Sequence, residues 1–419
     1  MPETLLGSIK VLSGWAFPST GFNDREGLPL IRIRDIGHAF TEVKFKGNYE
    51  DRYVVADGDV LIGMDGDFAV QRWTGGPALL NQRVCKVEAA SGALDHRFLY
   101  WYLMPHVADI HRKTPQTTVR HLSASSLTEI PAPPISVDEQ RAVAQVLDTL
   151  DTTIRQTEAI IEKLKQVKQG LLHDLLTRGI ADNGELRPPQ SEAPHLYKES
   201  ALGWIPSQWT VRRIEALLSA DEPAMRSGPF GSALLKHELV EHGVPLLGID
   251  NVHVERFHAE FTRFVTEKKF NELARYAVRA DDLMITIMGT VGRCCLVPEG
   301  VGRALSSKHT WTITLDRAAY SPLLAMLQIN YSEWISRQFA KDEQGGVMSA
   351  IRSETLRGLE LPTPPIKEQL AIEARMRAIS VRIDAESASL KKLRLNKSGL
   401  MDDLLTGRVR VGALQGARN

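Results

Sequence analysis

Hydrophobic residues recur three and four positions apart along two long stretches of the chain, which begin near residues 138 and 367. This is the spacing of the a and d positions that line one face of a coiled-coil helix. The pattern predicts two long helices, over residues 136–180 and 366–410, each roughly 60 Å long at 1.5 Å per residue. We call the apolar positions the seam residues: Leu147, Leu150, Ile154, Ile161, Leu164, Leu171 and Leu175 in the first helix, and Met376, Ile379, Ile383, Leu390, Leu393, Leu400 and Leu404 in the second.

The two stretches are copies of one another. Glu139 corresponds to Glu368 and Gly170 to Gly399, an offset of 229 residues in both cases (368 − 139 and 399 − 170). Each copy follows a Pro-Pro pair, which blocks extension of the helix backwards, and each is followed by a glycine suited to a left-handed cap. Two unrelated amphipathic helices on separate cores would not share a start, a seam and an ending at one offset.

The remaining regions are predicted to form two related globules, residues 1–135 and 201–365. In the first, the patterns over residues 28–36 and 83–87 predict strands, that over 57–64 a turn followed by a buried strand, and that over 97–104 a helix. Residues 27–33 resemble 243–249, and residues 59–66 resemble 282–289, so the second globule repeats the first with loop insertions. The polar, proline-rich residues 181–200 are predicted to be a linker, and residues 411–419 a flexible tail.

The order of segments is therefore globule, helix, linker, globule, helix. A tandem duplication tends to fold about a pseudo-two-fold axis, which would pair the helices antiparallel and carry the globules towards opposite ends. A parallel pairing would crowd both globules at one end. The predicted fold class is α+β, with two mixed α/β globules separated by an antiparallel coiled coil with pseudo-two-fold symmetry.

Composition narrows the possible functions. The 51 basic and 51 acidic residues cancel, so nucleic acid would have to be bound through local patches or with a partner. The three cysteines form neither a disulfide framework nor a zinc spacing, which favours a reducing, cytoplasmic setting. No signal peptide or membrane-spanning run is visible. There is no phosphate-binding P-loop, no dinucleotide fingerprint and no Asn/Asp-Pro-Pro-Tyr/Phe methyltransferase motif, and the sequence predicts neither a catalytic nor a metal site.

Loops rich in Arg, Lys, Gln and aromatic residues occur at comparable places in both globules. Basic side chains neutralise phosphates, and Gln, Asn and Arg match base edges in the major groove. Any one of these loops is equally consistent with an ordinary solvated loop, but the repetition of the set in both halves favours contact with DNA. The candidates are Arg72, Trp73, Asn81, Gln82, Arg112, Lys113, Gln116, Thr117 and Arg120 in the first globule, and Phe230, Ser232, Lys236, Arg293, Lys308, His309 and Arg352 in the second.

Nearly the whole chain resembles the specificity subunit of a Type I restriction–modification system. The resemblance is carried by the junctions at residues 127–140 and 359–369, by the Leu-rich helix ends at 170–177 and 399–406, and by residues 203–209. It implies that each globule is a target-recognition domain for one half of a bipartite double-stranded DNA site. The helices would then set the spacer, and their seams and surfaces would dock two modification subunits that methylate adenine N6.

The resemblance also implies where the cofactors belong. S-adenosylmethionine would be bound by the modification subunits, and ATP and Mg²⁺ by restriction subunits, with none bound by this chain. Three other functions stay open at this stage: a stand-alone enzyme with an unrecognised site, a coiled-coil scaffold that does not bind DNA, and an orphan subunit that supports methylation only.

Overall fold

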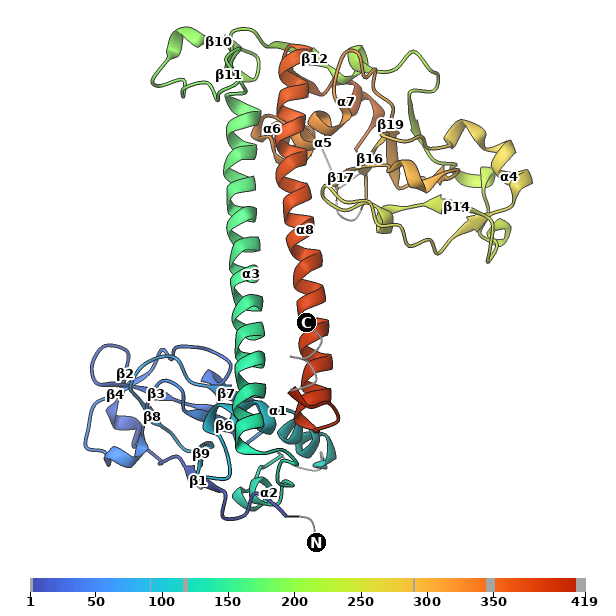
Figure 1. The fold of residues 1–419 in the computed structure, drawn as a ribbon. Helices are drawn as coiled ribbons and strands as arrows, with labels where there is room; N and C mark the ends of the chain where they lie inside the picture. Colours follow the sequence, from blue (N-terminus) through green and yellow to red (C-terminus); the bar gives the residue numbers. More distant parts are fainter. Residues whose placement is uncertain (1–2, 91, 116–119, 289–290, 344–350, 412–419) are drawn as a thin grey trace, which may run out of the picture. The chain divides into compact units, whose positions relative to one another are not determined.

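The computed structural model describes residues 3–90, 92–115, 120–288, 291–343 and 351–411 of the chain. It contains two compact units, one formed by Met1–Ile160 with Glu386–Asn419 and the other by Ile161–Ala385. Each unit holds one globule together with part of each long helix (Figure 1).

The two long helices are α3 (Val137–Thr177) and α8 (Ile366–Leu405). Gly179 and Gly407 follow them with φ values of 65° and 69°, which confirms the predicted left-handed caps. Helix α8 ends at Leu405, earlier than the predicted boundary at residue 410. Beyond it, Arg410 forms an ion pair with Glu139 in the first turn of α3.

The helices pair antiparallel within each unit. In the first unit, Glu158 of α3 contacts Arg394 of α8, and Asp151, earlier in α3, contacts Lys397, later in α8. In the second unit, the backbone N–H of Ile180, just past α3, donates to Glu368 at the start of α8. Every seam residue is buried or partly buried, as the apolar spacing predicts.

The first globule is built on two small sheets. One is antiparallel, with strand order β1-β9-β6-β7, and the other has the order β2-β4-β3-β8-β5, with β3 and β8 parallel. Helices α1 (His96–Lys113) and α2 (Ala124–Thr128) follow the sheets and lead into α3. The strands are β1 (Ile9–Ser13), β2 (Phe22–Asn23), β3 (Leu28–Ile31), β4 (Lys44–Phe45), β5 (Val54–Val55), β6 (Val60–Gly63), β7 (Val70–Arg72), β8 (Ala78–Leu80) and β9 (Val84–Ala89).

The second globule repeats this topology. Its four-stranded sheet has the order β13-β19-β16-β17, and its three-stranded sheet, β15-β14-β18, again contains one parallel pair. Its strands are β13 (Met225–Ser227), β14 (Val244–Leu247), β15 (Phe264–Val265), β16 (Leu283–Thr286), β17 (Cys294–Leu296), β18 (Leu305–Ser306) and β19 (Thr310–Ile313), with β12 (Thr210–Arg213) pairing β20 (Glu360–Thr363). Its helices are α4 (Glu267–Glu272), α5 (Pro322–Tyr331), α6 (Glu333–Glu343) and α7 (Ser353–Gly358). The predicted duplication is therefore present at the level of strand order.

The predicted elements of the first globule are found with altered bounds. The strand expected over residues 28–36 stops at Ile31, because the Asp35 carboxylate accepts a hydrogen bond from the backbone N–H of Arg32 (2.9 Å) and closes a 3₁₀ turn. The helix expected over residues 97–104 runs from His96 to Lys113. Its Asp95 cap accepts hydrogen bonds from the backbone N–H groups of Arg97 and Phe98.

The segment predicted as a linker, residues 181–200, is an ordered part of the second unit. Arg187 is buried there and pairs with Glu368, and strands β10 (Tyr197–Ser200) and β11 (Gly203–Pro206) form a hairpin. The polar, proline-rich composition of the segment does not predict this structure, because the burial of Arg187 depends on the carboxylate of Glu368, which is far away in the sequence. Residues 412–419 of the predicted tail lie outside the described residues. None of the described helices is long and apolar enough to cross a membrane.

Candidate nucleic-acid interface

The repeated Glu-Gln motif fastens each globule to a long helix. The Oε1 atom of Gln140 accepts a hydrogen bond from the backbone N–H of Asp95 (2.9 Å), and that of Gln369 accepts one from the backbone N–H of Ser321 (2.8 Å). Asp95 and Ser321 are the N-caps of α1 and α5. Both glutamines also donate to two backbone carbonyls. The motif thus anchors the main helix of each globule to the start of α3 or α8.

A second attachment in the first unit centres on Asp148 of α3. Its carboxylate accepts hydrogen bonds from Nη1 of Arg72 (2.8 Å), Nη2 of Arg97 (2.9 Å) and Nε1 of Trp101 (2.8 Å). Burial opposes ionisation of Asp148, but the hydrogen bonds from Arg72 and Trp101 and the charge of Arg72 outweigh it and lower its pKa. Arg72, predicted to contact DNA, is therefore placed where it holds the globule on the helix.

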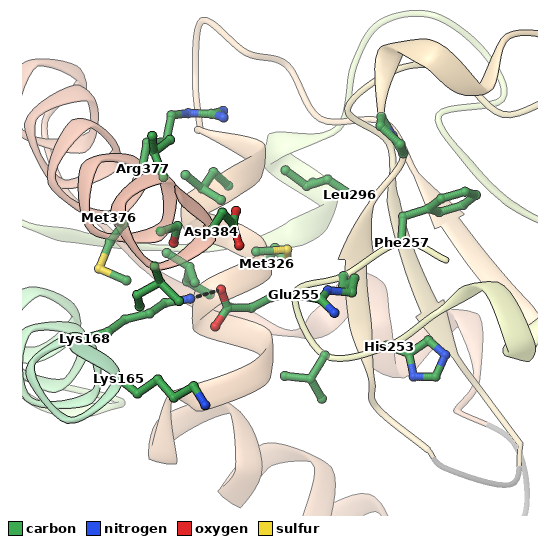
Figure 2. A pocket seen from close by; sticks show the side chains of 18 of the residues that line it. Lys165, Lys168, His253, Glu255, Phe257, Leu296, Met326, Met376, Arg377 and Asp384 are labelled. Atoms are coloured by element: carbon green, nitrogen blue, oxygen red, sulfur yellow. Dashed lines mark hydrogen bonds and ion pairs between the residues drawn. The ribbon is translucent and has the colours of Figure 1, made fainter. Parts of the chain in front are cut away.

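The second unit has its own attachment, centred on Glu255. Nζ of Lys168 on α3 lies 2.6 Å from its carboxylate, and the Tyr331 hydroxyl donates to the other carboxylate oxygen at 2.5 Å. Burial and the Glu255 carboxylate raise the pKa of Tyr331. Figure 2 shows the contact between Lys168 and Glu255. Both residues line a pocket of about 1010 Å³, together with residues of α5 and α8.

The corresponding lysine of the other helix copy contacts both the opposite helix and the globule in the first unit. Lys397 of α8 pairs with Asp151, and its Nζ lies 4.7 Å from the centre of the Trp101 ring. Lys168 and Lys397 occupy the same position of the repeat, where a lysine interrupts the apolar seam. Each lysine is used to join the helix pair to the globule of its own unit.

Several predicted DNA-contacting residues of the first globule are not available at the surface. Trp73 is fully buried and donates through Nε1 to the carbonyl of Gly76, and Asn81 is buried. Arg120 is partly buried against the ring of His111, with Nη1 2.7 Å from Nε2. The side chains of Arg72, Trp73 and Arg120 are therefore held by hydrogen bonds within the protein.

The exposed members of that set are Gln82, Arg112 and Lys113. Arg112 and Lys113 lie at the end of α1 and both pair with Asp109 one turn earlier. Such exposed pairs contribute little energy, so both cations can turn to a phosphate at small cost. Gln116 and Thr117 lie outside the described residues.

In the second globule Phe230, Ser232, Lys236, Lys308 and Arg352 are exposed, and Arg293 and His309 are partly buried. Nδ1 of His309 lies 3.2 Å from the Met288 sulfur. Burial, together with the charges of Lys308 and Arg263, lowers the pKa of His309, so its imidazole is neutral at pH 7. A neutral imidazole can both donate and accept hydrogen bonds, as reading a base edge requires.

Sequence reasoning missed Trp15, which lies two residues beyond the end of β1 and is 51% exposed. The signal that would have found it is a glycine and an aromatic residue together at the end of a strand, in both halves: Gly14-Trp15 and Gly228-Pro229-Phe230. Among the residues that the structure describes, no three His, Cys, Asp or Glu side chains are grouped so that they could hold a metal ion.

These features define a recognition protein with two globules of one topology. Each globule is attached to segments of the two antiparallel helices and exposes polar loops. Residues 9–166 match the model of the Type I restriction modification DNA specificity domain family. The chain is 26% identical over 382 residues to the Type I restriction enzyme EcoBI specificity subunit of Escherichia coli, which covers 90% of this chain and 78% of the relative. It is 23% identical over 371 residues to the MjaVIII specificity subunit of Methanocaldococcus jannaschii, which covers 85% and 80%.

The fold is also that of a solved structure. The crystal structure of the Type I restriction–modification S subunit from M. genitalium superimposes with a TM-score of 0.59 at 14% identity, and the match covers 97% of this chain and 96% of that one. Residues 9–166 thus resemble the Type I restriction specificity domain, and most of the chain is similar to Type I restriction specificity subunits.

Proposed function

We propose that this chain is the DNA-recognition subunit of a Type I restriction–modification complex, in which each globule reads one half of a bipartite site. The observation that carries the proposal is the repetition of strand order, junction glutamine and exposed polar loops within one chain. One chain therefore presents two recognition surfaces that share a backbone fold but carry different side chains. This arrangement suits an asymmetric site with two half-sites.

In this proposal the long helices set the spacer and dock two methyltransferase subunits, which bind S-adenosylmethionine and methylate adenine N6. Restriction subunits would supply ATP-dependent cleavage, and this chain itself would not be catalytic. Half-sites on one face of B-DNA lie about 34 Å apart per turn. A helix of 41 residues such as α3 is roughly 60 Å long and can bridge that distance. The balanced charge of the chain fits phosphate contacts shared with partner subunits.

Mapping N6-methyladenine across the genome of the source organism, with and without this gene, tests the proposal. The expected result is loss of methylation at a single bipartite motif when the gene is deleted. An unchanged methylome, together with no salt-dependent DNA binding by the complex that co-purifies with the chain, would support the scaffold alternative. Turnover of DNA by the purified chain alone, given S-adenosylmethionine or Mg²⁺, would support the stand-alone enzyme.

Exchanging residues 201–361 for the equivalent segment of a relative is expected to change one half-site and leave the other intact. The second unit has a hydrophobic core of its own, in which the globule packs on the α3 and α8 residues of that unit, so the exchanged segment meets the same kind of helix surface. Methylation mapping of cells that carry the hybrid gives the readout. A hybrid that alters both half-sites would show that the globules do not read DNA independently.

A further inference from the structure

In both globules the chain makes a tightly packed turn directly after the end strand of the four-stranded sheet, β1 or β13. We call this turn, with the neighbouring turn that it contacts, the corner. Gly14 follows β1 and Gly228 follows β13. A Cβ atom on Gly14 would collide with the backbone carbonyl of Asn81, and one on Gly228 with the backbone of Ser306 and Ser307. Only glycine allows the chain to pass so close to the neighbouring turn. The same steric requirement therefore shapes the two corners.

Backbone hydrogen bonds establish which residues correspond. The N–H of Asn81 donates to the carbonyl of Ile31 at the end of β3 (3.1 Å), and the N–H of Ser307 donates to that of Leu247 at the end of β14 (2.8 Å). Asn81 and Ser307 are thus equivalent, and the next residue, Gln82 in one globule and Lys308 in the other, is exposed in both.

An exposed aromatic side chain follows the glycine in each corner. Trp15 is 51% exposed and Phe230 is 60% exposed. The Trp15 ring lies against the buried Tyr53, with 5.8 Å between ring centres, and the Trp15 carbonyl accepts a hydrogen bond from the backbone N–H of Gln82 (2.9 Å). Trp15 is therefore held in place before any ligand binds, which reduces the entropy lost on binding.

The residues that complete the corner differ between the globules. Arg83 forms an ion pair with Asp65 in the turn that follows β6 (3.2 Å), and its counterpart His309 contacts Met288 in the segment that follows β16 (3.2 Å). The backbone of the two corners is therefore alike, but one corner carries the ion pair Arg83–Asp65 and the other the uncharged contact His309–Met288.

We propose that this corner is the base-contacting element of each globule, with Trp15 and Phe230 placed against the bases of their own half-sites and Gln82 and Lys308 beside them. Aromatic side chains contact DNA bases by stacking or by wedging between base steps. A glutamine amide matches the adenine edge and a lysine ammonium the guanine edge, so the two half-sites are read by different chemistry. This inference rests on the proposed function, and it names the residues that would perform the reading.

The test uses the full chain in complex with its methyltransferase partner and three duplexes. One carries the bipartite motif found by methylation mapping, and the others carry that motif with one half scrambled. Trp15→Ala is expected to weaken binding to the intact site about ten- to hundred-fold, the range of one lost base stack. It should also abolish discrimination against scrambling of one half only. Phe230→Ala should do the same for the other half.

Controls separate base contact from folding. Trp15→Leu keeps apolar packing on Tyr53 and should lose as much affinity as Trp15→Ala, whereas Trp15→Phe should recover most of it. Leu6→Ala and Trp204→Ala remove exposed apolar side chains outside the corner and should leave binding unchanged. If the wild-type complex discriminates both halves and the Trp15 and Phe230 variants do so equally well, or if both variants affect the same half, the inference is wrong while the proposed function stands. A wild-type complex that binds none of the duplexes overturns the proposed function itself.

Discussion

Replacing Glu368 by Ala is expected to lower the free energy of unfolding of the second unit by about 3–5 kcal/mol, the cost of leaving a buried charge unpaired. The Glu368 and Arg187 side chains are only 6% and 5% exposed. The Glu368 carboxylate accepts hydrogen bonds from Nη2 of Arg187 (2.8 Å) and from the backbone N–H of Ile180 (2.8 Å). Its removal leaves a buried guanidinium and a buried N–H at the junction of α3, α8 and the second globule.

The repeat supplies a matched control for this substitution. Glu139 occupies the same position of the duplicated motif, but its partner Arg410 is more than half exposed. Glu139 also accepts a hydrogen bond from the exposed backbone N–H of Ser136 (3.0 Å). Because water can replace both partners, Glu139→Ala should lower the urea unfolding midpoint much less than Glu368→Ala. Urea unfolding followed by tryptophan fluorescence makes the comparison. Equal losses in the two variants would contradict the assignment of Glu368 as a buried structural charge. The double variant Arg187→Met with Glu368→Leu should recover part of the loss.

Replacing Asp148 by Ala is expected to destabilise the first unit by about 2–3 kcal/mol, since hydrogen bonds to a charged acceptor are each worth more than neutral ones. The variant leaves the Trp101 N–H without its acceptor and brings the Arg72 and Arg97 guanidinium groups together without a counter-charge. Asp138→Ala, which removes an exposed carboxylate from the first turn of α3, is the control and should be near neutral. A neutral Asp148→Ala would show that the core alone holds this globule on its helix.

The contribution of Asp148 should also depend on pH. Because its pKa is lowered from the ordinary value of 3.8, the stabilisation is fully present above that value and is lost as the pH falls through the lower pKa of the folded state. The difference in unfolding free energy between the wild type and Asp148→Ala should therefore be constant from neutral pH down to about pH 5 and shrink well below pH 4. A difference that stays constant to the lowest pH at which the protein folds would exclude this linkage.

The long helices, their caps and the duplication could be predicted because their signals are local. The apolar positions recur with the helical period, proline stops a helix wherever it stands, and glycine favours a left-handed cap. Gly179 and Gly407 show this directly, as does the burial of Leu147 and Leu404. The antiparallel pairing also followed from the sequence, since the two copies of a duplication can share equivalent surroundings in that arrangement.

The candidate DNA interface was only partly predictable. Arg72, Trp73 and Asn81 have the composition of exposed recognition loops, but the fold turns all three towards the protein, while Trp15 remains at the surface. Arg187, in a segment that reads as a linker, is buried because Glu368, 181 residues further along the chain, lies beside it. The sequence by itself determined the helices, the two globules and the presence of polar loops, because helical periodicity involves neighbouring residues and a repeat is found by comparing two segments of the chain. The tertiary structure decided which charges are paired and which aromatic side chains are exposed, because burial depends on residues that only folding brings together.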